Sequence, residues 1–322
     1  MKRGLTFWLM MMASLTTFAG CATTRAPSPL VRDVSLAVPG EDRSLPVHVV
    51  YPARGRNLPL VLFSHGAYSS GDAYDALLRS WAERGYVVLS PTHRDSTSLG
   101  TKRGSPEPRF LAWRLDDMKL LLENLDATLR DVPQIAGRYD SRRIAATGHS
   151  FGGLIAQTIG GATYFDPSTG QTVSRSDPRI AAVLIFSGAG SMAPLLRPED
   201  FQSLTAPVMV TVGTQDLAQA PGLTGYEWRR QPFDLVPAGR AYLLTLDGAD
   251  HYLGGMVGRD DLPRAERGSE YVSEFNSASG LFLDAWLRGS KRAQRQLEMR
   301  TVPLAAPGRE GEPSPLATLE RR

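Results

Sequence analysis

The segment of this 322-residue chain with the clearest chemical meaning is Gly148-His149-Ser150-Phe151-Gly152, a G-x-S-x-G pattern. It follows the strand-like run 143–147 and precedes the helix-like run 154–157. A tight strand-to-helix turn lifts a serine hydroxyl out of the backbone, and glycines on each side let neighbouring chain pass close to the strained position. The pattern therefore predicts Ser150 as a nucleophile.

A serine nucleophile needs a base and an orienting acid, which follow this kind of turn in the order acid, then histidine. Four of the five histidines precede Ser150, and His251 alone follows it. Asp216 comes just after the strand-like run 208–213, on the kind of loop that carries functional side chains. Asp247 and Asp250 remain alternatives, although both are so near His251 in sequence that they would struggle to reach its far nitrogen.

Attack on an acyl carbon creates an oxyanion, which backbone N–H groups stabilise. One donor is expected from Phe151, directly after the nucleophile, and another from a loop after an earlier strand. The segment Ser64-His65-Gly66-Ala67-Tyr68 supplies such a loop, with Ala67 as the expected donor and Tyr68 as a wall of the pocket. The same residues would also suit a simple strand-ending turn.

Several other chemistries have no pattern to support them. No H-E-x-x-H, Cys/His cluster or calcium-type acidic loop occurs, so no metal site is expected. Neither G-x-G-x-x-G nor a P-loop is present, so no nucleotide cofactor is expected. A single cysteine excludes an internal disulfide.

The elements around these motifs alternate between short β-rich runs and helical stretches, which favours an α/β fold with a mainly parallel central sheet and helices on both faces. Continuously apolar runs such as 183–186 suit strands buried on both faces. Strands are predicted at 31–38, 45–51, 58–64, 86–90, 143–148, 180–187, 207–213 and 242–247. Helices are predicted at 72–83, across the leucine-rich stretch 111–129, and at 266–287.

The charge distribution argues against a nucleic-acid partner. The formal net charge is +3, but residues 21–287 carry 26 basic and 29 acidic residues. The excess positive charge lies at the two ends of the chain, where it usually marks a solvated terminus. We expect one domain over residues 31–290 and a disordered basic tail over residues 291–322, where prolines interrupt the helical pattern.

The N-terminal 20 residues are predicted to be a signal peptide, because two positive charges are followed by an apolar run of about 14 residues. This run is too short to span a bilayer. Phe18-Ala19-Gly20-Cys21 resembles the lipobox of bacterial lipoproteins, whose cysteine receives lipid. This predicts lipidation at Cys21, a tether over residues 21–30, and a location at the membrane of the bacterial cell envelope, facing the periplasm or exported. Plain secretion with Cys21 as a chance thiol is the alternative.

Together these motifs resemble the α/β hydrolases of the dienelactone-hydrolase-like group that includes platelet-activating factor acetylhydrolase. The resemblance covers roughly residues 46–288. Its pieces are residues 64–66, 85–88, 92–95, Arg114 with Asp117, residues 148–153, and Asp250-His251. It implies a serine esterase fold with the triad Ser150, Asp216 and His251, although dienelactone hydrolases proper carry cysteine where this chain has serine. The segment 92–95 is expected to buttress the site or to pack beneath it.

The expected activity is hydrolysis of carboxylic esters with short-chain or lipid-like acyl groups, through an acyl-enzyme. Segments 171–177 and 217–239, the latter carrying Tyr226, Trp228 and Phe233, are expected near the mouth of an apolar acyl pocket. The same triad could instead pass the acyl group to another acceptor or cleave an amide. A non-catalytic envelope-binding lipoprotein is the alternative from another class.

Overall fold

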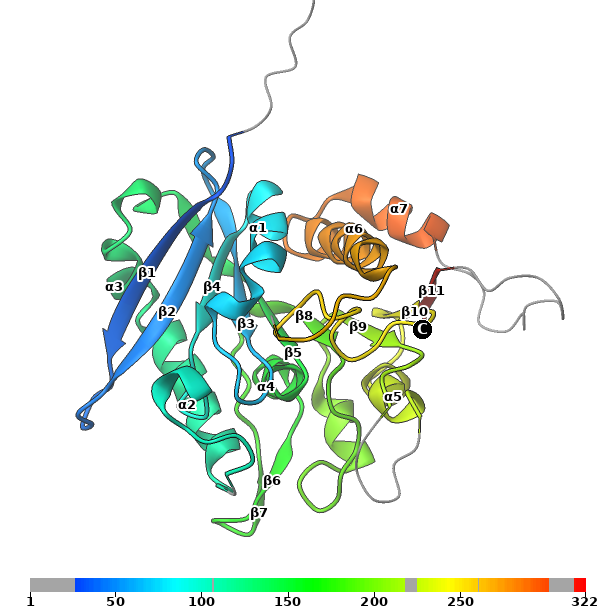
Figure 1. The fold of residues 1–322 in the computed structure, drawn as a ribbon, viewed down its shortest axis with the longest axis horizontal. Helices are drawn as coiled ribbons and strands as arrows, with labels where there is room; N and C mark the ends of the chain where they lie inside the picture. The colour runs from blue at the N-terminus through cyan, green and yellow to red at the C-terminus, as the bar shows by residue number, and fades with distance from the viewer. Residues whose placement is uncertain (1–26, 106, 218–224, 260, 301–315) are drawn as a thin grey trace, which may run out of the picture.

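The computed structural model describes residues 27–105, 107–217, 225–259, 261–300 and 316–322, and a nine-stranded sheet is its central feature (Figure 1). The strand order is β1-β2-β4-β3-β5-β8-β9-β10-β11. The strands are β1 (Leu30–Ala37), β2 (Ser44–Tyr51), β3 (Leu58–Ser64), β4 (Val87–Pro91), β5 (Tyr139–His149), β8 (Ile180–Phe186), β9 (Val208–Gly213), β10 (Ala241–Leu246) and β11 (Ala317–Arg321). A separate hairpin consists of β6 (Tyr164–Asp166) and β7 (Gln171–Val173).

The middle of the sheet is parallel, from β4 through β3, β5, β8 and β9 to β10. Its edges are antiparallel, where β1 and β2 pair on one side and β11 pairs with β10 on the other. Every residue of β3, β4 and β9 is buried, because helices cover both faces of these strands. The carboxyl ends of the parallel strands therefore meet at one edge of the sheet, where loops are free to carry a site.

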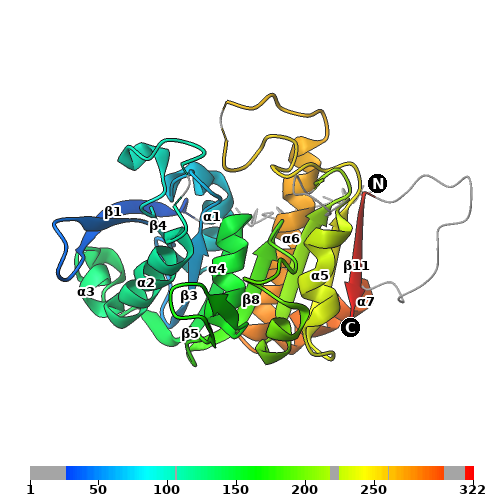
Figure 2. The same cartoon turned by 90° about the horizontal axis from the view of Figure 1, so that it is seen from below.

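Two layers of helices sandwich the sheet, on opposite sides of it in Figure 1. One hydrophobic core lies under α1, α6 and α7, and the other under α2, α3, α4 and α5. Figure 2, turned by 90°, shows α4 standing beside the central strands. The helices are α1 (Asp75–Glu83), α2 (Phe110–Glu123), α3 (Leu125–Arg130), α4 (Phe151–Gly160), α5 (Glu227–Leu235), α6 (Gly268–Trp286) and α7 (Lys291–Arg300).

The predicted fold class is confirmed, and each predicted strand exists, most within one or two residues of its predicted ends. The main exception is β5, which begins at Tyr139, four residues before the predicted start. The leucine-rich stretch, predicted as helical, is divided at Asn124 into α2 and α3.

The prediction of a disordered tail over residues 291–322 is wrong for its described parts. Residues 291–300 form α7, in which Ala293 and Leu297, four residues apart, are buried in the same core as α6. Residues 317–321 form β11, which pairs with β10 and buries Leu319. A few apolar side chains at helical or strand spacing were enough to dock these segments, despite their charged composition.

The predicted signal peptide, Cys21 and most of the tether lie outside the described residues. Residues 27–29 lead directly into β1. Within the part of the chain that is described, no helix combines the length and apolar character needed to cross a membrane.

Candidate active site

The predicted site residues come from loops at the carboxyl edge of the parallel strands. Ser150 lies between β5 and α4, Asp216 follows β9, and His251 follows β10. The loop carrying Ala67 follows β3, the strand next to β5. Side chains that are up to about 100 residues apart in the chain are thus brought to one end of the sheet.

Ser150 occupies a strained turn between β5 and α4, with φ 56° and ψ −118°. Its N–H donates to the carbonyl of Phe186 at 2.9 Å, which fixes the turn to the neighbouring strand. A Cβ on Gly148 would lie 2.1 Å from the carbonyl oxygen of Gly152, and one on Gly152 would lie 1.9 Å from that of Ser64. The two glycines are therefore required by close backbone contacts, as the motif predicts.

His251 and Asp216 are in direct contact. The Nδ1 of His251 lies 2.9 Å from Oδ1 of Asp216, whose side chain is 1% exposed, whereas that of His251 is 21% exposed. Burial alone would raise the pKa of Asp216, but the hydrogen bond from His251 and the charges of His251 and Arg229 outweigh it and lower the pKa. An ionised Asp216 holds the proton on Nδ1, so Nε2 is left free to accept one.

His251 lies beside the turn that carries Ser150, but in the described structure the two side chains form no hydrogen bond with each other. The ring of His149, directly before Ser150, lies 4.6 Å from the ring of His251, centroid to centroid. The Ser150 hydroxyl makes no hydrogen bond with any of the described residues. Catalytic hydrogen bonds of this kind are often long before substrate binds.

The two alternative acids are used elsewhere. Oδ1 of Asp250 accepts the N–H groups of Tyr252 and Gly254 and so shapes the turn after His251. Asp247 accepts the hydroxyl of Thr214 at 3.2 Å. Asp216 is therefore the carboxylate that orients His251 in this structure.

His149 holds the backbone of His251 in place. Its ring is fully buried and its Nε2 lies 2.8 Å from the His251 carbonyl oxygen, so Nε2 must carry the proton. Burial, with the nearby His251 charge, lowers the pKa of His149 far below its ordinary value, and the neutral ring accepts the Tyr74 hydroxyl at Nδ1. The Tyr74 oxygen in turn accepts the N–H of Gly66 at 3.1 Å. A chain of three hydrogen bonds thus connects the loop after β3 with the loop of His251.

The two expected oxyanion donors have no protein acceptor among the described residues. Among the described residues, neither the N–H of Ala67 nor that of Phe151 donates to a protein acceptor, while Gly66 and Tyr68, on either side of Ala67, both do. Phe151 is the first residue of α4, where helix N–H groups have no intrahelical acceptor. Both donors are therefore available to a ligand.

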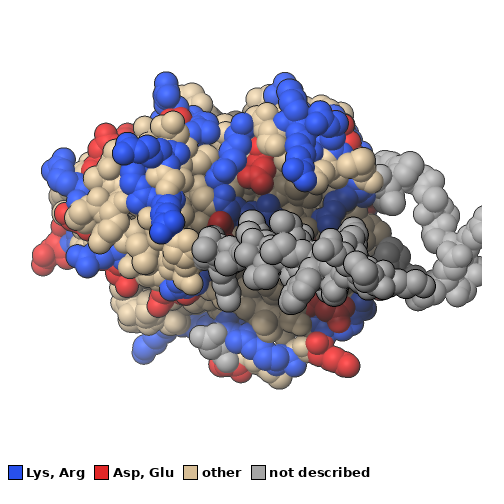
Figure 3. All heavy atoms as spheres, turned by 90° about the horizontal axis from the view of Figure 1, so that it is seen from above, with Lys and Arg blue, Asp and Glu red and all other residues tan. Residues whose placement is uncertain are grey.

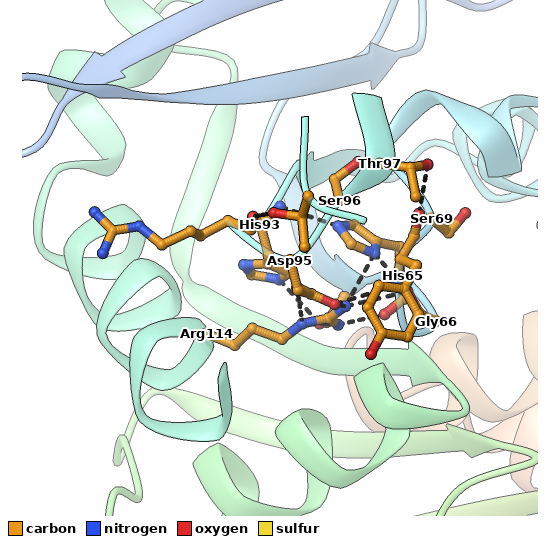
Figure 4. Close-up of polar contacts among 12 residues, drawn as sticks. His65, Gly66, Ser69, His93, Asp95, Ser96, Thr97 and Arg114 are labelled. Atoms are coloured by element: carbon orange, nitrogen blue, oxygen red, sulfur yellow. Dashed lines mark hydrogen bonds and ion pairs between the residues drawn. The ribbon is translucent and has the colours of Figure 1, made fainter. Parts of the chain in front are cut away.

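A network of buried ionic side chains contacts this loop. Figure 4 shows Arg114, Asp95 and His93 gathered beside His65 and Gly66. Arg114 forms a two-point ion pair with Asp95, with N–O distances of 2.7 and 2.6 Å. His93 bridges Asp117 and the hydroxyl of Ser64, each at 3.0 Å. The segment 92–95 therefore contacts the loop of Ala67 through His93 and Asp95, which agrees with the expectation that it buttresses the site.

Sequence reasoning missed Arg229, which belongs to α5. Its Nε lies 3.2 Å from the same oxygen of Asp216 that contacts His251, and its Nη1 donates to the carbonyls of Ser187 and Gly188. The carboxylate of the dyad thus has two cationic or potentially cationic neighbours. No sequence pattern signals this contact, because it depends on how α5 packs beside β9.

The prediction that segment 171–177 lies at the mouth is wrong. The N–H of Asp177 donates to the carbonyl of Ile159, near the C-terminal end of α4, whereas Ser150 precedes its first residue. The ten residues of α4 span about 15 Å, so segment 171–177 lies about that far from Ser150. The β6–β7 hairpin instead borders a cavity of about 470 Å³ at the other end of α4. Phe233, expected in the acyl pocket, is 1% exposed and packs in the core instead. Residues 218–224 of the second segment lie outside the described part.

Charged side chains of both signs lie on the surface outside the site. On the face drawn in Figure 3, Lys and Arg side chains lie in separate groups with some Asp and Glu between them. No cluster of three or more His, Cys, Asp or Glu side chains in the described ranges has the arrangement to hold a metal ion.

Comparison with known proteins agrees with this geometry. Residues 61–314 match a family described as the alpha/beta hydrolase family. A curated relative, platelet-activating factor acetylhydrolase of Cavia porcellus, is 26% identical over the matched region, which covers 33% of this chain and 32% of the relative. The chain thus spans about a third of the length of the relative it matches. A parallel sheet with a serine turn after its central strand, together with a family match over most of its length, shows that this chain belongs to the alpha/beta hydrolase family.

Proposed function

We propose that this protein hydrolyses carboxylic esters with short-chain or lipid-like acyl groups, and that Ser150 is its nucleophile. The observation that carries the proposal is the contact of 2.9 Å between His251 and Asp216, beside a serine held at φ 56°. Membership of the hydrolase family and the partial match to an acetylhydrolase support the same reaction class.

In the first half of the reaction, the Ser150 oxygen attacks the ester carbonyl carbon while its proton passes to Nε2 of His251. The carbonyl oxygen becomes an oxyanion, which accepts the N–H groups of Ala67 and Phe151. Asp216 stabilises the imidazolium that forms. When the tetrahedral intermediate collapses, the bond to the alcohol oxygen breaks, and His251 donates its proton to that oxygen.

In the second half, water attacks the acyl group on Ser150, and His251 accepts a proton from the water. Collapse of the second intermediate breaks the bond to Ser150, which regains its proton from His251. The products are an alcohol and a carboxylic acid, and the protein returns to its starting state.

Turnover of p-nitrophenyl acetate and butyrate by the full chain, Ser150→Ala and Ser203→Ala tests this function. Ser203 precedes β9, at the edge of the sheet opposite the carboxyl ends of its parallel strands. In the part of the chain that the structure describes, its hydroxyl bonds only the backbone of Thr163 and Asp200. We expect Ser150→Ala to lose at least a thousandfold in kcat/KM and Ser203→Ala to match the wild type. Equal turnover by all three proteins would refute the proposal.

The same assay distinguishes ester hydrolysis from acyl transfer and amide cleavage. Adding an alcohol acceptor would divert the product to a new ester if the protein were an acyltransferase, and p-nitroanilide substrates would be cleaved if it were an amidase. The absence of turnover on all ester probes would favour the non-catalytic envelope-binding alternative.

We also propose that Cys21 carries a lipid that anchors the protein to the membrane of a bacterial cell envelope. The basis is the sequence Phe18-Ala19-Gly20-Cys21 after an apolar run. Metabolic labelling with a radioactive fatty acid would mark the wild type and leave Cys21→Ser unlabelled. Equal labelling of both proteins, or of neither, would contradict the anchor.

A further inference from the structure

Arg114, on α2, donates hydrogen bonds to the loop that carries the Ala67 N–H. Its side chain is only 1% exposed, and it donates to the carbonyl oxygens of His65 and Gly66. A third contact, 3.3 Å long, reaches the hydroxyl of Ser64. Figure 4 shows Arg114 pointing toward His65 and Gly66, with Asp95 beside it.

These contacts fix the direction of the Ala67 N–H. In a trans peptide the C=O and the following N–H point in opposite directions. The carbonyl oxygen of Gly66 accepts Nη2 of Arg114 at 3.1 Å and Nδ1 of His65 at 2.7 Å, so the N–H of Ala67 must point away from Arg114. The described chain contains a cis bond at Ala193-Pro194 and none at this peptide.

The preceding peptide is held in the same manner. The His65 carbonyl accepts Nη1 of Arg114, while the N–H of Gly66 donates to Tyr74 on the opposite side. The His65–Gly66 peptide is therefore fixed at both its carbonyl and its N–H. The Gly66–Ala67 peptide is fixed at its carbonyl by two donors, and the Ala67 N–H is left without an acceptor among the described residues. A loop with a free glycine would otherwise have many orientations open to it.

His65 contributes as a neutral ring. Burial, together with the charge of Arg114, lowers its pKa far below the ordinary value. Its Nε2 accepts the N–H of His93 at 3.0 Å, so the single proton is on Nδ1 and is donated to Gly66. The nearby Nη2 of Arg114 thus bonds the same carbonyl rather than the ring.

Asp95 offsets the free-energy cost of burying the charge of Arg114. A guanidinium removed from water is costly unless it is paired and hydrogen-bonded, and Asp95 meets Arg114 at two points. Oδ2 of Asp95 also accepts the N–H of Tyr68 at 3.1 Å, which fixes the loop on the far side of Ala67. The guanidinium also lies 4.6 Å from the ring centroid of Phe151, the residue expected to supply the second oxyanion donor.

We propose that Arg114, paired with Asp95, is a positioning residue that aims the Ala67 N–H at the oxyanion of the substrate. The inference rests on the ester hydrolysis proposed above and adds what holds its oxyanion hole in shape. A cation at the Gly66 carbonyl also polarises that peptide, which makes the Ala67 N–H a stronger donor.

The test compares Arg114→Lys with the wild type in the full chain. Lysine keeps the charge but has no planar fork, so it cannot bond Asp95 and both carbonyls together. We expect kcat for p-nitrophenyl butyrate to fall about a hundredfold, the loss typical of one oxyanion donor, with KM changed less than about threefold. Affinity for a trifluoromethyl ketone, which forms an oxyanion on Ser150, should fall by a similar factor.

Arg179→Gln is the matched control, because Arg179 makes the same kinds of contact elsewhere. It pairs with Asp177 at two points and donates to the carbonyl of Leu122 at 2.7 Å, at the far end of α4. We expect its kcat and its ketone affinity to match the wild type.

Asp95→Asn is a second variant in case Arg114→Lys does not fold, which circular dichroism will show. It keeps the shape of the pair and should give a smaller loss of the same kind, in kcat and ketone affinity together. The inference would be overturned if Arg114→Lys folds and keeps the wild-type kcat. If only Asp95→Asn folds, the wild-type kcat in that variant would overturn it. So would a loss of kcat with unchanged ketone affinity. Undiminished turnover by Ser150→Ala would instead refute the proposed nucleophile, on which the inference rests.

Discussion

Replacing Asp216 with asparagine should damage the protein in two separable ways. An asparagine amide can donate to Nδ1 of His251, which would move the ring proton to Nε2 and leave no acceptor for the Ser150 proton. A dyad carboxylate changed in this way typically costs about 10⁴-fold in kcat. The same substitution removes the anion that faces Arg229 at 3.2 Å.

The loss of stability follows from that second contact. At an effective dielectric constant of about 20, two unit charges 3.2 Å apart attract by about 5 kcal/mol. Arg229 is 13% exposed, so in the variant water can solvate its charge in part and replace some of the lost attraction. We therefore expect Asp216→Asn to lower the free energy of unfolding by about 3 kcal/mol. Adding Arg229→Met removes the unpaired cation and should restore at least half of the stability but none of the activity.

Urea unfolding and ester turnover of the wild type, both single variants and the double variant measure the two effects. Arg229→Met alone leaves the contact between His251 and Asp216 and should reduce kcat less than about tenfold. Turnover by Asp216→Asn within tenfold of the wild type would refute the assigned acid. A double variant no more stable than Asp216→Asn would refute the electrostatic account of Arg229.

Three further perturbations test the packing around the site. Gly152→Ala places a Cβ 1.9 Å from the Ser64 carbonyl, so we expect kcat to fall at least a hundredfold; near-normal turnover would show that the contact relaxes freely. Deleting residues 316–322 removes β11 and the buried Leu319, worth about 2 kcal/mol, so Tm in a thermal melt should drop by roughly 4–8 °C; an unchanged Tm would mean that β11 contributes nothing. Although burial raises their pKa values, hydrogen bonds and charges of Arg114 and His93 lower those of Asp95 and Asp117 below the usual 3.8. Their stabilising effect is complete above that value and is lost as pH falls through the lower native pKa values, so Tm should decline below about pH 4, and less steeply in Asp95→Asn. Tm that stays constant down to pH 2 would contradict this linkage.

The sequence predicted the sheet and the triad candidates for reasons that are local. Continuous apolar runs such as 183–186 can only be buried strands in this context, and the turn at Ser150 requires glycines at fixed positions. His251 followed from chain order, because it alone comes after the nucleophile. The choice of Asp216 over Asp247 and Asp250 rested on the distance a side chain can span.

What the sequence could not predict depends on contacts between distant segments. Arg114 meets Gly66 only because α2 packs under the loop after β3, and Arg229 meets Asp216 only because α5 lies beside β9. The position of segment 171–177 was predicted wrongly since nothing in its residues indicates which end of α4 it approaches. β11 was missed because a five-residue edge strand after a proline-rich stretch has too weak a pattern.

The central claim is that the hydroxyl of Ser150 attacks the substrate. The most direct measurement is intact mass spectrometry of the full chain after reaction with a fluorophosphonate, followed by peptide mapping. We predict one adduct, on Ser150, and none on the Ser150→Ala variant. An adduct on another residue, or unmodified Ser150 in a protein that still turns over esters, would contradict the account.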